Sequence, residues 1–245
     1  MSSIILSLQS IITAMLPPTC GLCHSVQAEK NHFGICNKCL EHVLINDKSR
    51  CRICDLPTTA RLCEQCRVNL PPYKAVVAPF LYGGTIAEII TRAKFHKREE
   101  LILGLARMVV AQERVRHCFK DVSMIVPVPL GTRRLRQRQF NQSAVLARVI
   151  GKEMGIRVKY VLKRKRQTLP QSQLSLVNRA QNVKNAFFSR QLVYGRCILV
   201  DDVVTSGQTI REAAEVLCNA GASEVIVVAA ARTVQIFSSN DADKN

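Results

Sequence analysis

Short apolar runs alternate with segments in which apolar positions recur every three or four residues, and this alternation continues through most of the chain. Residues 197–200 and 225–230 are almost wholly apolar, as is typical of central strands covered on both faces. Two further β-rich runs and four helical segments complete the pattern, at residues 75–82, 122–126, 86–93, 99–116, 140–154 and 210–217. Strands that alternate with helices predict an α/β fold with a mostly parallel sheet flanked by helices.

The composition adds one important property, which is a large positive charge. Hydrophobic residues make up 47% of the 245 residues and charged residues 22%, so the chain can bury a substantial core. Lys and Arg number 35 against 18 Asp and Glu, which gives a formal net charge of +17. Such an excess favours a polyanionic partner, such as nucleic acid, a phosphorylated ligand or an acidic membrane face. A merely soluble basic surface is the alternative.

Eight of the eleven cysteines form four pairs with two residues between the partners. The pairs are Cys20/Cys23, Cys36/Cys39, Cys51/Cys54 and Cys63/Cys66. This spacing presents both thiolates to one tetrahedral metal ion, so four pairs predict two structural Cys₄ zinc sites. Sequential pairing gives four consecutive cysteines to each site, but spacing alone also permits interleaved or nested pairing. Thioredoxin-type redox chemistry is the alternative, and the lack of a surrounding βαβ pattern disfavours it.

Residues 197–209 combine an apolar strand, paired acids, a hydroxyl-rich turn and a helix start. The acids are Asp201 and Asp202, and the turn comprises Thr205, Ser206, Gly207, Gln208 and Thr209. A helix start offers unpaired N–H groups and a positive dipole end to a phosphate. The two carboxylates are placed to accept hydrogen bonds from ribose hydroxyls or to meet Mg²⁺. We therefore predict a sugar-phosphate site, with an ordinary capped helix after a buried strand as the alternative.

Two basic runs lie between this motif and the strand expected at 122–126. The first is expected to be a loop and contains Arg133, Arg134, Arg136 and Arg138. The second includes Lys163, Arg164, Lys165 and Arg166 and continues into a polar, Gln-rich segment with Arg179, which we expect to be a long mobile loop. Guanidinium groups bind phosphate oxygens in paired geometry, which favours pyrophosphate or a nucleic-acid backbone. Solvated basic faces are the alternative.

These motifs together resemble known proteins. The 197–209 segment resembles the phosphoribosyl pyrophosphate (PRPP) motif of type I phosphoribosyltransferases. With the cysteine pairs, Pro127-Val-Pro, Phe140-Asn-Gln and the spacing of Thr168, Gln171, Leu174, Arg179 and Asn182, residues 20–232 resemble the ComF family. That resemblance implies a bacterial cytoplasmic protein needed for natural transformation and DNA utilisation. Two positions depart from the family pattern: Gly131-Thr132 replaces a frequent His-Pro, and Gln139 replaces a Gly.

The resemblance also implies roles for the residues. Asp201 and Asp202 are the expected catalytic pair, which would hold PRPP with Mg²⁺. The residues expected to bind its phosphates are Thr205, Ser206, Gly207, Gln208, Thr209, Arg133, Arg134, Arg166 and Arg179. The candidates for contact with nucleic acid are Arg136, Arg138, Lys163, Arg164 and Lys165.

We expect four parts in the chain. These are an N-terminal amphipathic segment (1–16), a double Cys₄ zinc module (17–69), a type I phosphoribosyltransferase-like domain (73–236) and a polar tail (237–245). The first segment lacks the basic start of a secretory signal, and no apolar run reaches the roughly 18 residues of a membrane span. The expected location is therefore the cytoplasm, or the periphery of the inner membrane.

Two functions fit these features. The first is a DNA-uptake protein that binds single-stranded DNA and holds PRPP or another sugar phosphate in a transferase-type pocket. The alternative is an active phosphoribosyltransferase that uses PRPP and Mg²⁺ on an unidentified acceptor. Because aromatic residues make up only 5% of the chain, base stacking is sparse and DNA binding is expected to be largely sequence-independent. The zinc module is a further expected docking surface, for a DNA-uptake translocase or a recombination mediator.

Overall fold

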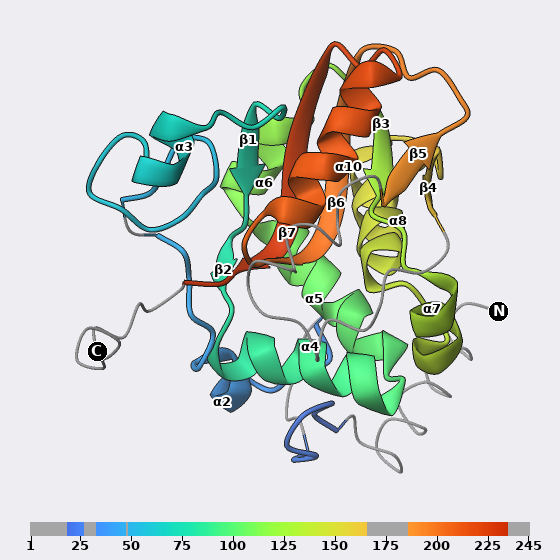
Figure 1. Ribbon diagram of the computed structural model, residues 1–245. Helices are drawn as coiled ribbons and strands as arrows, with labels where there is room; N and C mark the ends of the chain where they lie inside the picture. Colours follow the sequence, from blue (N-terminus) through green and yellow to red (C-terminus); the bar gives the residue numbers. More distant parts are fainter. Residues whose placement is uncertain (1–18, 27–32, 48, 166–185, 235–245) are drawn as a thin grey trace, which may run out of the picture.

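The computed structural model describes residues 19–26, 33–47, 49–165 and 186–234, which build a parallel sheet between two layers (Figure 1). The strand order is β1-β7-β6-β3, and β2 also pairs with β7. The strands of this sheet are β1 Ala75–Val77, β2 Phe80–Leu81, β3 Val122–Pro127, β6 Arg196–Val204 and β7 Glu224–Arg232. A separate antiparallel pair consists of β4 Leu162–Arg164 and β5 Phe187–Ser189. The predicted α/β class with a parallel sheet is therefore confirmed.

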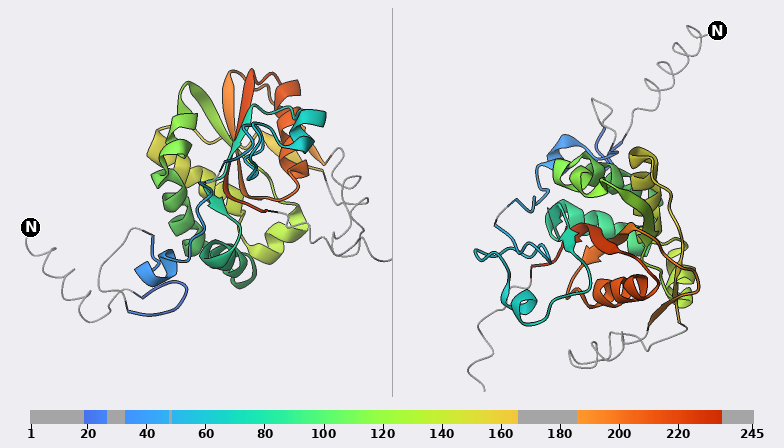
Figure 2. Two further views of the ribbon diagram at one scale, coloured as in Figure 1. Left: turned by 90° about the vertical axis from the view of Figure 1, so that its left-hand side faces the viewer. Right: turned by 90° about the horizontal axis from the view of Figure 1, so that it is seen from above.

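Helices cover both faces of the sheet (Figure 2). The described helices are α2 Asn37–Leu40, α3 Glu64–Val68, α4 Gly84–His96, α5 Glu99–Ala111, α6 Glu113–Arg116, η1 His117–Phe119, α7 Thr132–Arg138, α8 Gln142–Met154 and α10 Gln208–Asn219. One face packs against α4, α5 and α8. The other face packs against α10 and the β4–β5 pair. The central strands are therefore shielded from water on both sides.

Alternation along β6 explains why its residues 197–200 are all apolar. Ile198 and Val200 face the core formed with α4, α5 and α8. Cys197 and Leu199 face the second core, which contains residues of α10. Successive side chains of a strand point to opposite faces, so a strand buried on both sides needs apolar residues at every position.

Three local expectations differ from the structure. The run 75–82 is divided into β1 and β2 at Pro79, whose ring nitrogen has no hydrogen to donate to a sheet. The helix expected over 99–116 is interrupted at Gln112, which has an extended conformation (ψ 123°). The expectation of a loop at Arg133–Arg138 is wrong, because these residues lie in α7. The helical backbone fixes the directions in which the four arginine side chains leave the chain.

The cysteine-rich segments pack on the α/β body at two different places. Cys20, Leu22 and Ile35 belong to the core beneath α4 and α5. The later segment forms its own small cluster and bonds to the sheet edge, where Val76 N–H donates to Ile53 O (2.7 Å). The expected parts 1–16 and 237–245 lie outside the described residues. No helix in the described ranges combines the length and the apolar character that a membrane crossing needs.

Candidate functional site

The carboxyl end of β6 carries the two predicted acids in different environments. Asp201 is 9% exposed, and its Oδ1 accepts hydrogen bonds from Ser143 Oγ (2.8 Å) and the Asp202 N–H (2.9 Å). Asp202 is half-buried, and its Oδ2 lies 2.6 Å from Lys94 Nζ. The adjacent carboxylates are therefore not equivalent: Asp201 is held by the protein, and Asp202 is paired with a cation that a ligand could displace or share.

Burial dominates the acidity of Asp201. It raises the pKa of Asp201 from 3.8 to about 7, and the neighbouring Asp202 carboxylate acts in the same direction. The hydrogen bonds from Ser143 and the Asp202 N–H oppose this change, and Lys94 opposes it more weakly. A positive ligand such as Mg²⁺ would favour the ionised form of the pair.

The start of α8 places the Ser143 hydroxyl on Asp201. Asn141 caps this helix, since its Oδ1 accepts from the Ser143 N–H (3.1 Å) and its Nδ2 donates to Val128 O (2.9 Å). The preceding Gln139 has φ +66°, in the left-handed region that favours glycine. The family pattern has Gly at this position, so the backbone conformation explains the pattern, and Gln139 adopts it at some conformational cost.

Arginines from α7 and β4 converge on the paired acids. Burial lowers the pKa of Arg138, the nearby Asp202 opposes this change, and Arg134 reinforces it. Burial also lowers the pKa of Arg164, with Arg134 acting in the same direction and Glu212 and Asp201 opposing. The Arg164 guanidinium lies over the Phe187 ring, 5.3 Å from its centroid. Two half-buried guanidinium groups beside the two carboxylates, with that of Arg134 near both arginines, form a site suited to a ligand that combines phosphates with hydroxyls.

Residues 205–209, the turn predicted to bind phosphate and called the phosphate-binding turn below, lead from the end of β6 into the start of α10. Gly207 has φ +79° and precedes the first helical residue, Gln208. Thr205 and Ser206 are exposed, and the Ser206 Oγ accepts from the Gln208 N–H (3.4 Å). In the described residues no acceptor is bonded to the Ser206 or Gly207 N–H group. These donors at a helix N-terminus are available to an anion.

The remaining predicted basic residues are distributed between the pocket and the surface. Arg133, Arg136, Lys163 and Lys165 are exposed, and Arg134, Arg138 and Arg164 are half-buried. Arg166 and Arg179 lie outside the described residues, as does most of the expected long loop. The nucleic-acid candidates thus include both outward-facing residues and two arginines that are directed toward the acids.

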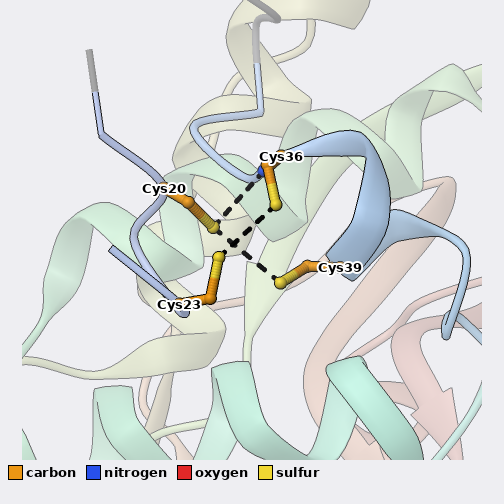
Figure 3. A group of neighbouring side chains, drawn as sticks. All are labelled: Cys20, Cys23, Cys36 and Cys39. Carbon is orange, nitrogen blue, oxygen red and sulfur yellow. Dashed lines mark hydrogen bonds between the residues drawn. The ribbon is translucent and has the colours of Figure 1, made fainter. Parts of the chain in front are cut away.

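The first cysteine cluster brings Cys20, Cys23, Cys36 and Cys39 together (Figure 3). The sulfur atoms are 3.9 Å apart for Cys20 and Cys39, and 3.5 Å apart for Cys23 and Cys36. Tetrahedral zinc with Zn–S bonds of about 2.3 Å needs sulfurs about 3.8 Å apart. The Cys20 Sγ also accepts from the backbone N–H groups of Leu22 and Cys36 (both 3.4 Å). This donor set fits zinc.

The second cluster comprises Cys51, Cys54, Cys63 and Cys66, all of them buried. All four sulfurs lie within 4.8 Å of one another, and those of Cys54 and Cys63 are 3.5 Å apart. The geometry therefore selects the sequential pairing and excludes the interleaved and nested alternatives. Among the described residues each cluster offers four thiols, which is the ligand set of a structural zinc site.

Sequence reasoning missed three residues that organise the site. Lys94 and Ser143 reach the paired acids from α4 and α8, and Arg232 reaches the start of the turn 205–209 from β7. The only local signal is at Ser143, which directly follows Phe140-Asn-Gln. The other residues lie in no distinctive sequence motif. Their contribution becomes visible only when the fold brings distant segments together.

Comparison with known proteins identifies the relatives of this chain. Residues 141–236 match the family model described as phosphoribosyl transferase domain. The DNA utilization protein YhgH of Escherichia coli O6:H1 is 34% identical over 228 residues, covering 89% of this chain and 99% of that protein. Competence protein F of Haemophilus influenzae is 30% identical over 220 residues, covering 86% of this chain and 90% of that protein.

A solved structure that matches part of the chain is the glutamine phosphoribosylpyrophosphate amidotransferase from B. subtilis complexed with ADP and GMP. It is 22% identical with a TM-score of 0.37, and the match covers 53% of this chain and 26% of that chain. The family-model match, together with the parallel sheet, gives the phosphoribosyltransferase-like α/β fold that the sequence predicted, and the cysteine clusters that precede it are compatible with zinc ribbons.

Proposed function

The chain belongs to the ComF family, with the DNA utilization protein YhgH and competence protein F, and we propose that it serves natural transformation and DNA utilisation. In this role it binds single-stranded DNA on the cytoplasmic side and PRPP-like phosphates in the pocket at the end of β6. The observation that carries the proposal is the placement of Lys94 and the half-buried arginines of α7 and β4 beside the paired acids at the end of β6, which leads into the turn 205–209.

Each part of the pocket has a proposed task. The turn 205–209 holds a 5′-phosphate through backbone N–H groups and hydroxyls. Asp202 accepts hydrogen bonds from ribose hydroxyls, while Asp201, fixed by Ser143, lies behind it and ionises when Mg²⁺ is bound. The arginines assigned to the pyrophosphate in this proposal are Arg133, Arg134, Arg166 and Arg179. Mg²⁺, when bound with PRPP, neutralises part of the pyrophosphate charge, because it prefers oxygen ligands.

Both cysteine clusters are proposed to hold structural zinc. Their sulfur geometry matches tetrahedral coordination, and each draws together two segments that have few apolar side chains of their own. Zinc binding then contributes folding free energy to these segments. The zinc module proposed at 17–69, which precedes the transferase-like domain proposed at 73–236, is also the proposed docking surface for a DNA-uptake translocase or a recombination mediator.

Single-stranded DNA is proposed to follow the exposed cations of α7 and the β4 region. Arg133, Arg136, Lys163 and Lys165 are exposed, and in this proposal they contact backbone phosphates without reading the bases. Such binding weakens steeply with salt, because each neutralised phosphate releases counterions. Arg138 and Arg164, which are half-buried, contribute at the inner end of this path.

The DNA proposal is tested by the salt dependence of binding. Replacing Arg133, Arg136, Lys163 and Lys165 by Ala should lower the slope of log K against log salt by about 3, since each contact to single-stranded DNA contributes about 0.7. The matched control replaces four other exposed basic residues by Ala: Arg61, Arg67, Lys120 and Lys152. Fluorescence anisotropy with a labelled oligonucleotide measures both slopes. An unchanged slope in the first variant places the DNA surface elsewhere.

An active phosphoribosyltransferase is the second candidate, and the match of residues 141–236 to the phosphoribosyl transferase domain favours it. Catalysis would come from positioning PRPP and from cationic stabilisation of the leaving pyrophosphate. Pyrophosphate release from PRPP and Mg²⁺ in the presence of a panel of nucleobases separates the two functions. Release that requires an added base identifies a transferase and its acceptor, and binding without release supports the first candidate.

A further inference from the structure

Arg232, at the end of β7, connects the second cysteine cluster to the phosphate-binding turn. Its side chain is only 3% exposed. Its Nε donates to the carbonyl of the cluster residue Cys54 (3.1 Å), and its Nη1 donates to the carbonyls of Val204 (2.7 Å) and Thr205. One buried guanidinium thus bridges a proposed metal ligand and the two residues that lead into the turn.

These hydrogen bonds help to fix the direction of donors in the turn, and the Val204 carbonyl also accepts from the Thr233 N–H (3.0 Å). A trans peptide is planar, so the C=O of one residue and the N–H of the next point in opposite directions. The Thr205 carbonyl faces Arg232, and therefore the Ser206 N–H points away from Arg232. The same relation holds for the Val204 carbonyl and the Thr205 N–H. Arg232 is positioned to turn these N–H groups toward a bound phosphate.

A second set of contacts links the far side of the turn to the same cluster. Arg211, in the first turn of α10, donates to the backbone carbonyls of Asn69 and Leu70 (2.9 and 3.1 Å), directly after α3. Tyr73 is buried, and a Cβ built on Gly207 would lie 3.8 Å from its hydroxyl. Helix α3 carries Cys66, so both ends of the turn are connected to the second cluster.

The first cluster has no comparable connection among the described residues. Its segment contacts the helical layer, where Thr85 Oγ1 donates to Cys39 O (2.6 Å) and Arg92 Nη1 donates to Leu22 O (2.5 Å). Both donors lie on α4, across the sheet from α10. The two clusters therefore support different parts of the molecule.

We propose that Arg232 is a positioning residue that couples the second cysteine cluster to the phosphate-binding turn, so that the turn binds phosphate well only while this cluster holds its metal. Metal binding fixes the backbone at Cys54, Arg232 transfers that order to Val204 and Thr205, and the turn presents its N–H groups. Metal loss or thiol oxidation at the second cluster then weakens phosphate binding. The ligand part of this inference rests on the proposed function of the pocket.

Amide hydrogen exchange and calorimetry with ribose 5-phosphate, on the full-length zinc-loaded protein, test the coupling. Arg232→Met should speed exchange over residues 204–209 and weaken ribose 5-phosphate binding, each by at least about tenfold, because charge-assisted hydrogen bonds to the turn are lost. Its zinc content should stay unchanged. Arg196→Met, at the opposite end of the neighbouring strand β6, is the matched control and should leave both quantities unchanged.

Two cysteine variants make the test specific to the cluster. Cys63→Ser should reproduce the fast exchange and weak binding, whereas Cys23→Ser, in the first cluster, should leave the turn unaffected. Equal effects of the two variants, or normal exchange in Arg232→Met, would overturn the coupling. If Arg232→Met does not fold, the comparison of the cysteine variants decides. If the unmodified protein binds no ribose 5-phosphate, the proposed function fails, and the exchange data still decide the coupling.

Discussion

Asp201 offers a quantitative test of the site, because it is a buried carboxyl whose charge the fold opposes. Burial raises its pKa from 3.8 to about 7. The folded protein therefore holds a proton that the unfolded chain has already released, and stability falls as the pH rises from about 4 to about 7. Each tenfold change in proton affinity is worth about 1.4 kcal/mol, so the full effect is about 4 kcal/mol.

The perturbation is Asp201→Asn, which mimics the protonated carboxyl and keeps an oxygen to accept from Ser143 and the Asp202 N–H. Between pH 5 and pH 8 the unmodified protein should lose about 2 to 3 kcal/mol of unfolding free energy through this one group. The variant should lack that loss, so its stability relative to the unmodified protein should rise by the same amount over this range.

The assay is urea denaturation at several pH values with zinc present, and circular dichroism monitors the unfolding. Glu153→Gln, an exposed residue on α8, controls for the removal of one negative charge. The free-energy difference between the unmodified protein and Asp201→Asn should change with pH, while that for Glu153→Gln should stay constant. A constant difference for Asp201→Asn would refute the buried, protonated state that we assign to this carboxyl.

Three further predictions concern other parts of the structure. Gln139→Gly should raise the unfolding free energy by up to about 1 kcal/mol, because φ +66° is strained for a residue that carries a side chain. Thermal denaturation measures the change in stability, and a loss of stability would contradict the strain. Lys94→Met should lower the unfolding free energy by roughly 1 kcal/mol, because it leaves the half-buried Asp202 unpaired. A double-mutant cycle with Asp202→Asn measures the pair, and additive effects on unfolding free energy would disprove it. Metal analysis should find about two zinc ions per chain, and chelation should lower the melting temperature; one ion would mean that one cluster has another role.

Much of the fold could be predicted because its signals are local. The runs 197–200 and 225–230 are apolar at every position, which only strands buried on both faces require, and they correspond to β6 and β7. The cysteine spacing predicted the ligand pairs, and the structure then selected the sequential grouping. The break at Gln112 and the helix at Arg133–Arg138 were not predicted, because tertiary packing overrides weak local preferences.

The pocket was less predictable than the fold because its supports are non-local. The PRPP-like motif identified Asp201, Asp202 and the turn, but not the difference in burial between the two acids. Lys94 and Arg232 reach the motif from segments far away in the chain. A single sequence contains no signal for such contacts, since they depend on strand order and helix placement.

The central claim is that the pocket at the end of β6 binds PRPP, and calorimetric titration with PRPP and Mg²⁺ tests it most directly. The unmodified protein and Glu153→Gln should bind PRPP with equal affinity, and Asp202→Asn should lose binding while it keeps its fold and its zinc. Equal binding by Asp202→Asn, or no binding by the unmodified protein, would contradict the account.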